Sequence, residues 1–243
     1  MDRGALLLVA HGSADPRAGA TTRALARAVA AVRPGIDVRA SFLDHAGPRP
    51  DDVLFALSRH GHRSAAVVPV LLTSAYHGRV DLPGVLARAR EGGLQLDASQ
   101  SDVLGPVDGT THPLLLRALR RRLAEAGTGD TDGVVLIAAG TRDDTARGSV
   151  DVVAGELQAD LGVPCRAGFA SGSVVTAAVA VDELRDLGCR RVAIASYFLA
   201  RGRLYDTAVS SARSRGALLP AAEPLGSDFD IARLVLERAD AVT

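Results

Sequence analysis

Short apolar runs alternate with amphipathic stretches along the first half of the chain. The apolar runs predict strands near residues 5–10, 36–42, 65–71 and 94–98. The amphipathic stretches predict helices near residues 17–33, 50–60, 82–91 and 113–126. Strands that alternate with helices in this way predict an α/β fold, in which a parallel sheet carries helices on both faces.

The second half of the chain repeats the first. LLLVAHGSAD at residues 6–15 resembles VVLIAAGTRD at residues 134–143, and GIDVRASFL at 35–43 resembles GVPCRAGFA at 162–170. Strands are therefore expected near residues 133–138, 164–169, 191–198 and 217–221, after a Gly/Asp-rich linker at 127–130. We expect two tandem homologous doubly wound domains, residues 1–127 and residues 131–243, each a four-stranded parallel sheet flanked by helices.

Two histidines follow the first and third predicted strands. His11 comes directly after residues 5–10, His77 follows residues 65–71, and a glycine comes after each. In doubly wound sheets these two strands commonly lie side by side, and ligands bind at their carboxyl ends. Imidazole binds Fe²⁺, Co²⁺ and Ni²⁺ and accepts protons near pH 7. The pair indicates a metal site that also takes up protons; a hydrogen-bonded structural role is the alternative.

The repeat locates this chemistry in the first half of the chain. The matching positions are His11 and Ala139, His77 and Leu204, Gly12 and Gly140, and Asp15 and Asp143. Both imidazoles are therefore lost from the second half while the surrounding residues are kept. Another histidine, His45, stands beside Asp44 after the second predicted strand, where it either reaches the edge of the crevice or is solvated.

The chain resembles the sirohydrochlorin chelatases, the class II chelatases, in their long two-domain form. The motifs that carry the resemblance are VAHGSADPR, PVLLTSAYHGRVDLP at residues 69–83, LGPVDGTTHPLL at 104–115 and SYFLARGRL at 196–204. The resemblance implies a lyase in which His11 and His77 bind the metal and assist deprotonation of the tetrapyrrole. It implies Fe²⁺ as the metal substrate, for sirohaem synthesis, or Co²⁺, for cobalamin synthesis, without an organic cofactor.

Arginine and serine side chains near the predicted crevice are candidates for holding this substrate. Sirohydrochlorin carries many carboxylates, which arginine binds well. The expected contacts are Arg17, Arg79, Arg201 and Arg203. All 28 basic residues are arginine, so a solvated loop arginine is the alternative for each. Ser13 and Ser74 either bind the substrate or cap the adjacent helix and turn.

Composition limits the other functions that the chain can have. The 28 acidic and 28 basic residues balance, which argues against nucleic acid or an anionic membrane as a partner. No apolar stretch approaches the roughly 20 residues that span a bilayer, so a cytoplasmic protein is expected. The duplication predicts a monomer with internal pseudo-twofold symmetry. A carrier that binds metal or tetrapyrrole without turnover is the non-enzymatic alternative.

Overall fold

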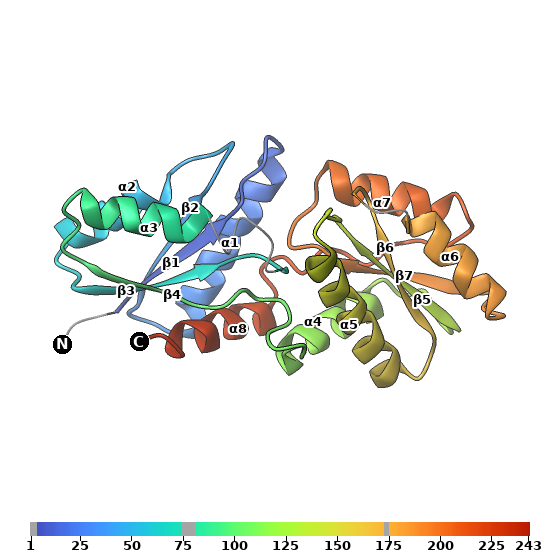
Figure 1. Ribbon diagram of the computed structural model, residues 1–243. Helices are drawn as coiled ribbons and strands as arrows, with labels where there is room; N and C mark the ends of the chain where they lie inside the picture. Colours follow the sequence, from blue (N-terminus) through green and yellow to red (C-terminus); the bar gives the residue numbers. More distant parts are fainter. Residues whose placement is uncertain (1–3, 74–80, 173–174) are drawn as a thin grey trace. The chain divides into compact units, whose positions relative to one another are not determined.

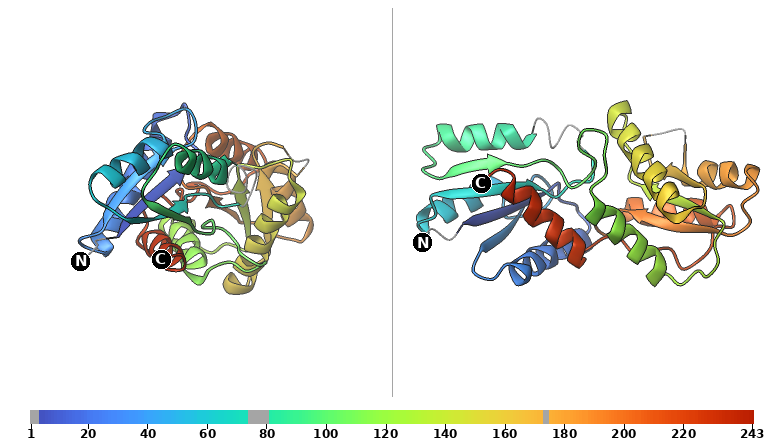
Figure 2. Two further views of the ribbon diagram at one scale, coloured as in Figure 1. Left: turned by 60° about the vertical axis from the view of Figure 1, so that its left-hand side comes forward. Right: turned by 90° about the horizontal axis from the view of Figure 1, so that it is seen from below.

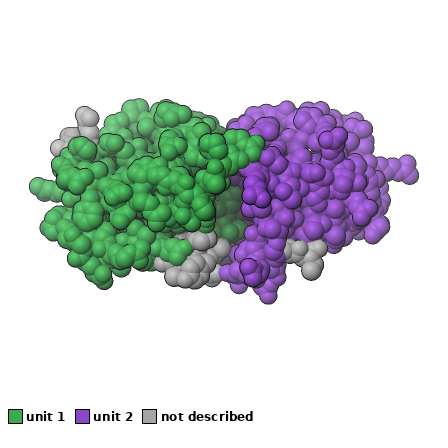
Figure 3. Space-filling view, turned by 90° about the horizontal axis from the view of Figure 1, so that it is seen from above, with its two compact units in different colours: residues 1–105, 227–243 green, residues 106–226 purple. Residues whose placement is uncertain are grey.

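The computed structural model describes residues 4–73, 81–172 and 175–243 (Figure 1). The strands are β1 (Ala5–Ala10), β2 (Asp37–Phe42), β3 (Ser64–Pro69), β4 (Asp97–Gln100), β5 (Gly133–Ala138), β6 (Cys165–Phe169) and β7 (Val192–Tyr197). The helices are α1 (Pro16–Val32), α2 (Pro50–Arg59), α3 (Leu82–Glu91), α4 (Pro113–Glu125), α5 (Asp144–Leu161), α6 (Ala177–Asp186), α7 (Arg203–Arg213) and α8 (Phe229–Asp240). The chain forms two compact units, coloured separately in Figure 3.

Unit 1 comprises Met1–Gly105 and Ser227–Thr243 and contains a four-stranded parallel sheet. Its strand order is β2-β1-β3-β4, which confirms that the first and third strands are neighbours. Helices α2 and α3 cover one face of the sheet, and α1 and α8 cover the other. Because β1 and β3 are parallel neighbours, their carboxyl ends lie at the same edge of the sheet, and His11 follows β1 at that edge.

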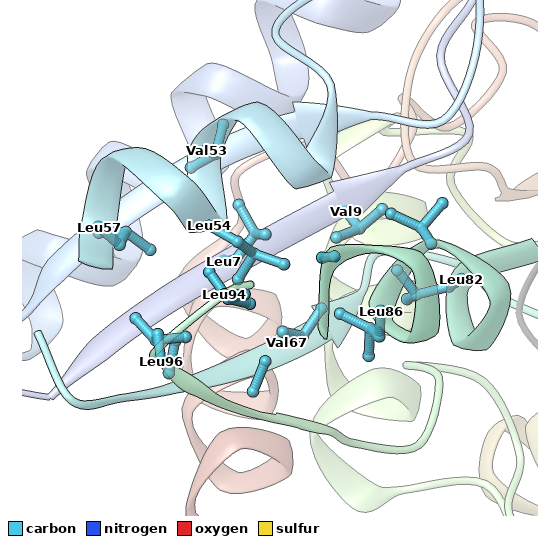
Figure 4. Close-up of a cluster of buried hydrophobic side chains, with 14 of the residues drawn as sticks. Leu7, Val9, Val53, Leu54, Leu57, Val67, Leu82, Leu86, Leu94 and Leu96 are labelled. Carbon is cyan, nitrogen blue, oxygen red and sulfur yellow. The ribbon is translucent and has the colours of Figure 1, made fainter. Parts of the chain in front are cut away.

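Alternating side chains of β1 supply the centre of this unit. Leu7 and Val9 point toward α2 and α3, where they meet Leu54 and Leu86 in a cluster that excludes water (Figure 4). Burial of one such side chain contributes about 1.5–3 kcal/mol relative to exposure. Since Leu6 and Leu8 are also fully buried, β1 is covered on both faces, as its uninterrupted apolar run predicted.

Unit 2, Pro106–Gly226, contains a parallel sheet in the order β6-β5-β7. Helices α6 and α7 cover one face, and α4 and α5 cover the other. The prediction of a fourth strand near residues 217–221 was wrong, because the described residues of this sheet form three strands. The chain there still runs along β7, because Leu218 N donates to Val192 O and Ala222 N donates to Ile194 O. Pro220 between them has no N–H to donate, so a regular ladder does not form.

The last helices of the two sequence repeats are exchanged between the units. Helix α8 ends the second repeat but packs on α1 and β3 in unit 1, where Figure 2 shows it beside α1. Helix α4 ends the first repeat but packs on β7 and α5 in unit 2. The compact units therefore have different boundaries from the expected domains, residues 1–127 and 131–243. None of the described helices is long and apolar enough to cross a membrane.

Candidate functional site

The turn from β1 into α1 positions His11. Gly12 has a φ of 93°, and a Cβ atom there would overlap the main-chain carbonyl oxygen of Asp44. Gly140 in the second repeat has a φ of 90° and the same close approach to the carbonyl oxygen of Ser171. Glycine is required at both positions because only glycine tolerates this conformation and this contact.

Ser13 and Asp15 complete the turn. Ser13 Oγ accepts a hydrogen bond from Asp15 N at 3.0 Å, and the Asp15 carboxylate caps α1 by accepting from Arg17 N at 3.0 Å. Thr141 and Asp143 form the same turn at the start of α5. The turn role of Ser13 is thus observed, while its contact with substrate stays a prediction. The frame around His11 is structural, since the second repeat keeps it without the imidazole.

His11 is half-buried at the edge of the sheet, and one of its ring nitrogens has a clear partner. Its Nδ1 lies 3.0 Å from Gly12 O. A carbonyl oxygen only accepts, so Nδ1 is the donor of this hydrogen bond. A main-chain carbonyl on one ring nitrogen is the usual arrangement for a histidine that binds metal through the other.

The loop after β2 brings two further polar residues to this edge. Asp44 N donates to His11 O at 2.8 Å, and the ring centroids of His45 and His11 lie 6.3 Å apart. The His45 main-chain N–H bonds to the Asp44 carboxyl and lowers its pKa. The Asp44 carboxylate is therefore ionised at neutral pH.

Sequence reasoning left Asp44 out of the site and left the place of His45 open. The signal that identifies them is their position after β2, the neighbour of β1, and their replacement by Ser171 and Gly172 in the second repeat. The second repeat thus lacks these polar groups as well as the imidazole of His11.

The chain leaves β3 at the same edge. Val9 pairs with Pro69, and Val70 N donates to Val9 O at 2.8 Å, so the two strands end side by side. The predicted site residues Ser74, His77 and Arg79 follow in residues 74–80, which lie outside the described residues. Their place at this edge stays a prediction from the sequence.

The structure describes three of the four arginines that were predicted to bind substrate. Arg17 donates through Nε and Nη2 to both carboxylate oxygens of Asp15, while its side chain is about half exposed. In unit 2, Arg201 pairs with the Glu223 carboxylate and lies 5.5 Å from the Tyr205 ring. A substrate carboxylate would have to share or replace these acidic partners.

Arg201 also lines an open hollow of about 710 Å³ in unit 2, while Arg203 is the exposed first residue of α7. Roles in substrate binding stay predictions for all these arginines.

The matching edge of unit 2 has a different chemical character. Ala139 packs against an apolar cluster that includes Phe198 and Tyr205, and Leu204 stands in the first turn of α7 with an exposed side chain. Within the described parts of the chain, no group of three or more His, Cys, Asp or Glu residues is arranged to hold a metal. Of the two sheet edges, the one in unit 1 offers imidazole.

Comparison with known proteins agrees with this fold. SirB from Bacillus subtilis with Fe³⁺ has a TM-score of 0.81 and 23% identity, over 98% of this chain and 94% of that chain. SirB from Bacillus subtilis subspecies spizizenii in complex with cobalt has a TM-score of 0.77 and 21% identity, over the same shares of the two chains. At these identities the two structures show a shared fold.

Sequence comparison identifies the family. A sirohydrochlorin cobaltochelatase of Methanosarcina acetivorans is 29% identical over 98 residues, which are 40% of this chain and 75% of that protein. The CbiX family model matches residues 5–126 and again residues 133–242, so both repeats are members. Because these two matches cover nearly the whole chain, the protein belongs to the CbiX family, the sirohydrochlorin chelatases that its motifs resemble.

Proposed function

We propose that the protein inserts a divalent metal into sirohydrochlorin. Fe²⁺ is the first candidate metal, and sirohaem is then the product. The observation that carries the proposal is the difference between the repeats. They share the glycine, the helix cap and the loop hydrogen bonds, yet the imidazole of His11 and the carboxylate of Asp44 occur in the first repeat alone. The features that both repeats share are explained by folding, whereas His11 and Asp44 are not needed for the fold and are therefore candidates for the chemistry.

In this proposal His11 holds the incoming metal through Nε2. The hydrogen bond from Nδ1 to Gly12 O fixes the ring and raises its basicity toward metal. A site with few protein ligands suits a metal that must be released to the macrocycle, because a closed cage of four ligands retains its ion. The Asp44 carboxylate, which stays ionised, offsets part of the positive charge of the ion.

Metal insertion also releases two pyrrolic protons from the macrocycle. His77 is the proposed acceptor, because neutral imidazole takes up protons near pH 7 and the sequence places this histidine after β3, the neighbour of β1. The exposed arginines Arg17, Arg201 and Arg203, with Arg79, are proposed to bind substrate carboxylates. Ser13 and Ser74 are proposed as neutral hydrogen-bonding partners of the substrate.

The test is an anaerobic assay of Fe²⁺ with sirohydrochlorin, in which the absorbance of the macrocycle reports metal insertion. Catalysis above the metal-only control is expected, and equal rates would refute the proposal. His11→Ala and His77→Ala should each lower turnover by about 100-fold or more, the range for loss of an acid–base group. Leu204→Ala at the matching position of the second repeat should retain most activity. Stoichiometric binding without turnover would instead identify a carrier.

Co²⁺ is the second candidate metal, and the cobaltochelatase relative supports it. Imidazole ligands follow the general affinity order of divalent metals and do not select iron over cobalt. The same assay with Fe²⁺ and Co²⁺ in competition therefore decides between them. The metal with the higher kcat/KM at equal free concentration is the substrate.

A further inference from the structure

His45 adopts a backbone conformation that costs free energy for any residue with a side chain. Its φ is 57°, and it is the central residue of a tight turn that Ala46 N closes by donating to Asp44 O at 2.7 Å. The second repeat has Gly172 at this position, with a φ of 66°. Glycine avoids this strain, so the first repeat carries a histidine at a position where the backbone conformation favours glycine.

The loop path itself imposes this conformation, since the two repeats share it bond by bond. In the first repeat Phe42 N, Leu43 N and Asp44 N donate to Pro48 O, Ala10 O and His11 O. In the second repeat the three matching donations run from Phe169, Ala170 and Ser171 to Val175, Ala138 and Ala139. The position of His45 is therefore set by the main-chain hydrogen bonds of the loop and not by packing of its side chain.

The position of His45 suits the capture of a metal ion. Its side chain is about 52% exposed, whereas His11 behind it is half-buried. The ring centroids lie 6.3 Å apart, and an ion bound by one nitrogen of each ring lies roughly 3.2 Å from each centre when the metal–nitrogen bond is about 2.1 Å. The two distances sum to nearly the observed separation, so one ion can bridge both rings when the two nitrogens lie on opposite sides of it.

The second ring nitrogen of His45 also has the partner that metal-binding histidines commonly have. His45 Nε2 lies 3.5 Å from the Asp44 carboxylate, and Asp44 in turn accepts from His45 N at 2.8 Å. A carboxylate that bonds to one nitrogen of a histidine ring leaves the other nitrogen available to bind an ion, and a small rotation of the exposed His45 ring would bring Nε2 to hydrogen-bonding distance of Asp44.

We infer that His45 is an outer metal ligand, which captures the hydrated Fe²⁺ or Co²⁺ from solvent and shares it with His11 before the tetrapyrrole is metallated. This inference rests on the proposed function, because it takes His11 as the ligand that receives the ion. It assigns to the loop after β2 a step in metal loading that precedes insertion.

The test measures Co²⁺ binding to the metal-free full chain without tetrapyrrole, by titration calorimetry and by the visible absorbance of bound Co²⁺. His45→Gly is the informative variant, because it removes the imidazole and installs the residue that the second repeat carries. Its affinity for Co²⁺ should fall by about tenfold or more, since even outer-shell changes at metal-bound histidines cost that much. Its thermal unfolding midpoint should be unchanged or higher, which separates ligand loss from a folding defect.

His60→Ala is the matched control, because His60 is an exposed histidine at the end of α2 that precedes β3, at the amino end of the sheet. It should bind Co²⁺ as tightly as the wild type. Wild-type affinity in His45→Gly, or an equal loss in His60→Ala, overturns the inference while metal insertion by the wild type leaves the proposed function intact. Weakened Co²⁺ binding in His45→Gly alone, in a chain that inserts no metal, identifies His45 as a metal ligand but refutes the proposed function and, with it, the place of His45 in metal loading.

Discussion

Arg122 on α4 and Arg238 on α8 perform the same task in the two units. Arg238 donates to Val103 O at 2.9 Å and to Gly105 O at 3.3 Å, and Arg122 donates to Leu225 O at 3.2 Å. These carbonyls belong to the last residues before the chain passes from one unit into the other. Each exchanged helix is thus fastened to the segment that leaves its own unit.

Arg238→Met should lower the free energy of unfolding by about 1.5–3 kcal/mol, the usual contribution of hydrogen bonds to a charged group. The methionine keeps most of the apolar stem, so the loss reports on the guanidinium. Urea denaturation measures the change. Arg233→Met on the same helix is the control, because Arg233 has a half-exposed side chain and lies 3.9 Å from Glu237. It should cost under about 1 kcal/mol. Equal losses in the two variants would contradict a stabilising role for the hydrogen bonds from Arg238 to Val103 and Gly105.

A chain truncated after Gly226 should lose structure in unit 1 selectively. Helix α8 buries Ile231, Leu234 and Val235 completely, and without it the faces of α1 and β3 that they cover meet water. Hydrogen exchange should show protection lost in β1 and β3 and retained in β5 and β7. Protection that is lost evenly from both sheets, or retained in both, would contradict the division into units.

Gly140→Ala should destabilise the protein by several kcal/mol, as strain at a positive φ and a steric overlap combine. The new Cβ would meet the main-chain carbonyl oxygen of Ser171, which follows β6. Gly148→Ala is the control, because Gly148 lies within α5 with open space around it, and alanine there should stabilise by about 0.5–1 kcal/mol. Thermal unfolding compares the two variants; a mild effect at Gly140 would show that the loop can move.

The ion pair between Arg33 and Asp240 should make stability depend on acid pH. The Arg33 guanidinium donates to the Asp240 carboxylate and lowers its pKa below the usual range. The stabilisation is therefore complete above the ordinary carboxyl pKa of about 3.9 and is lost as the pH falls through the lower folded value. Both side chains are about half exposed, so its size should stay within about 1 kcal/mol.

Urea midpoints between pH 7 and pH 2.5 measure this effect. Asp240→Asn should reduce the loss of stability on acidification, and Arg33→Met should reduce it by the same amount. The double variant should add nothing further, because the two residues form one interaction. Independent effects of the two substitutions would show that the carboxylate is stabilised by other groups.

Much of this fold could be predicted because local signals and tertiary packing agree. The apolar run of β1 is buried on both faces, and Asp15 and Asp143 cap helices as their positions before apolar periodic segments suggest. The exchange of α4 and α8 could not be predicted. Both helices bury a similar apolar stripe, Leu115 with Leu119 in one and Ile231 with Val235 in the other, and periodicity does not tell which sheet each one covers.

The candidate site could be predicted in part. Strand order follows from topological rules, so the position of His11 at the carboxyl edge could be anticipated. The role of the loop after β2 could not, because the strain at His45 is a property of the backbone angle, and the sequence shows only the difference between His45 and Gly172. That difference was the available signal.

The exchange of final helices has a consequence for the order in which the chain is made. Unit 2 can close once Gly226 has left the ribosome, whereas unit 1 waits for Phe229–Asp240, which follow the whole of unit 2 in the chain. Domains usually complete folding in the order of their synthesis, amino-terminal first. Here the order is reversed: the unit that carries His11 starts first but is completed second, and the face of β3 that α8 covers stays open until unit 2 has been made.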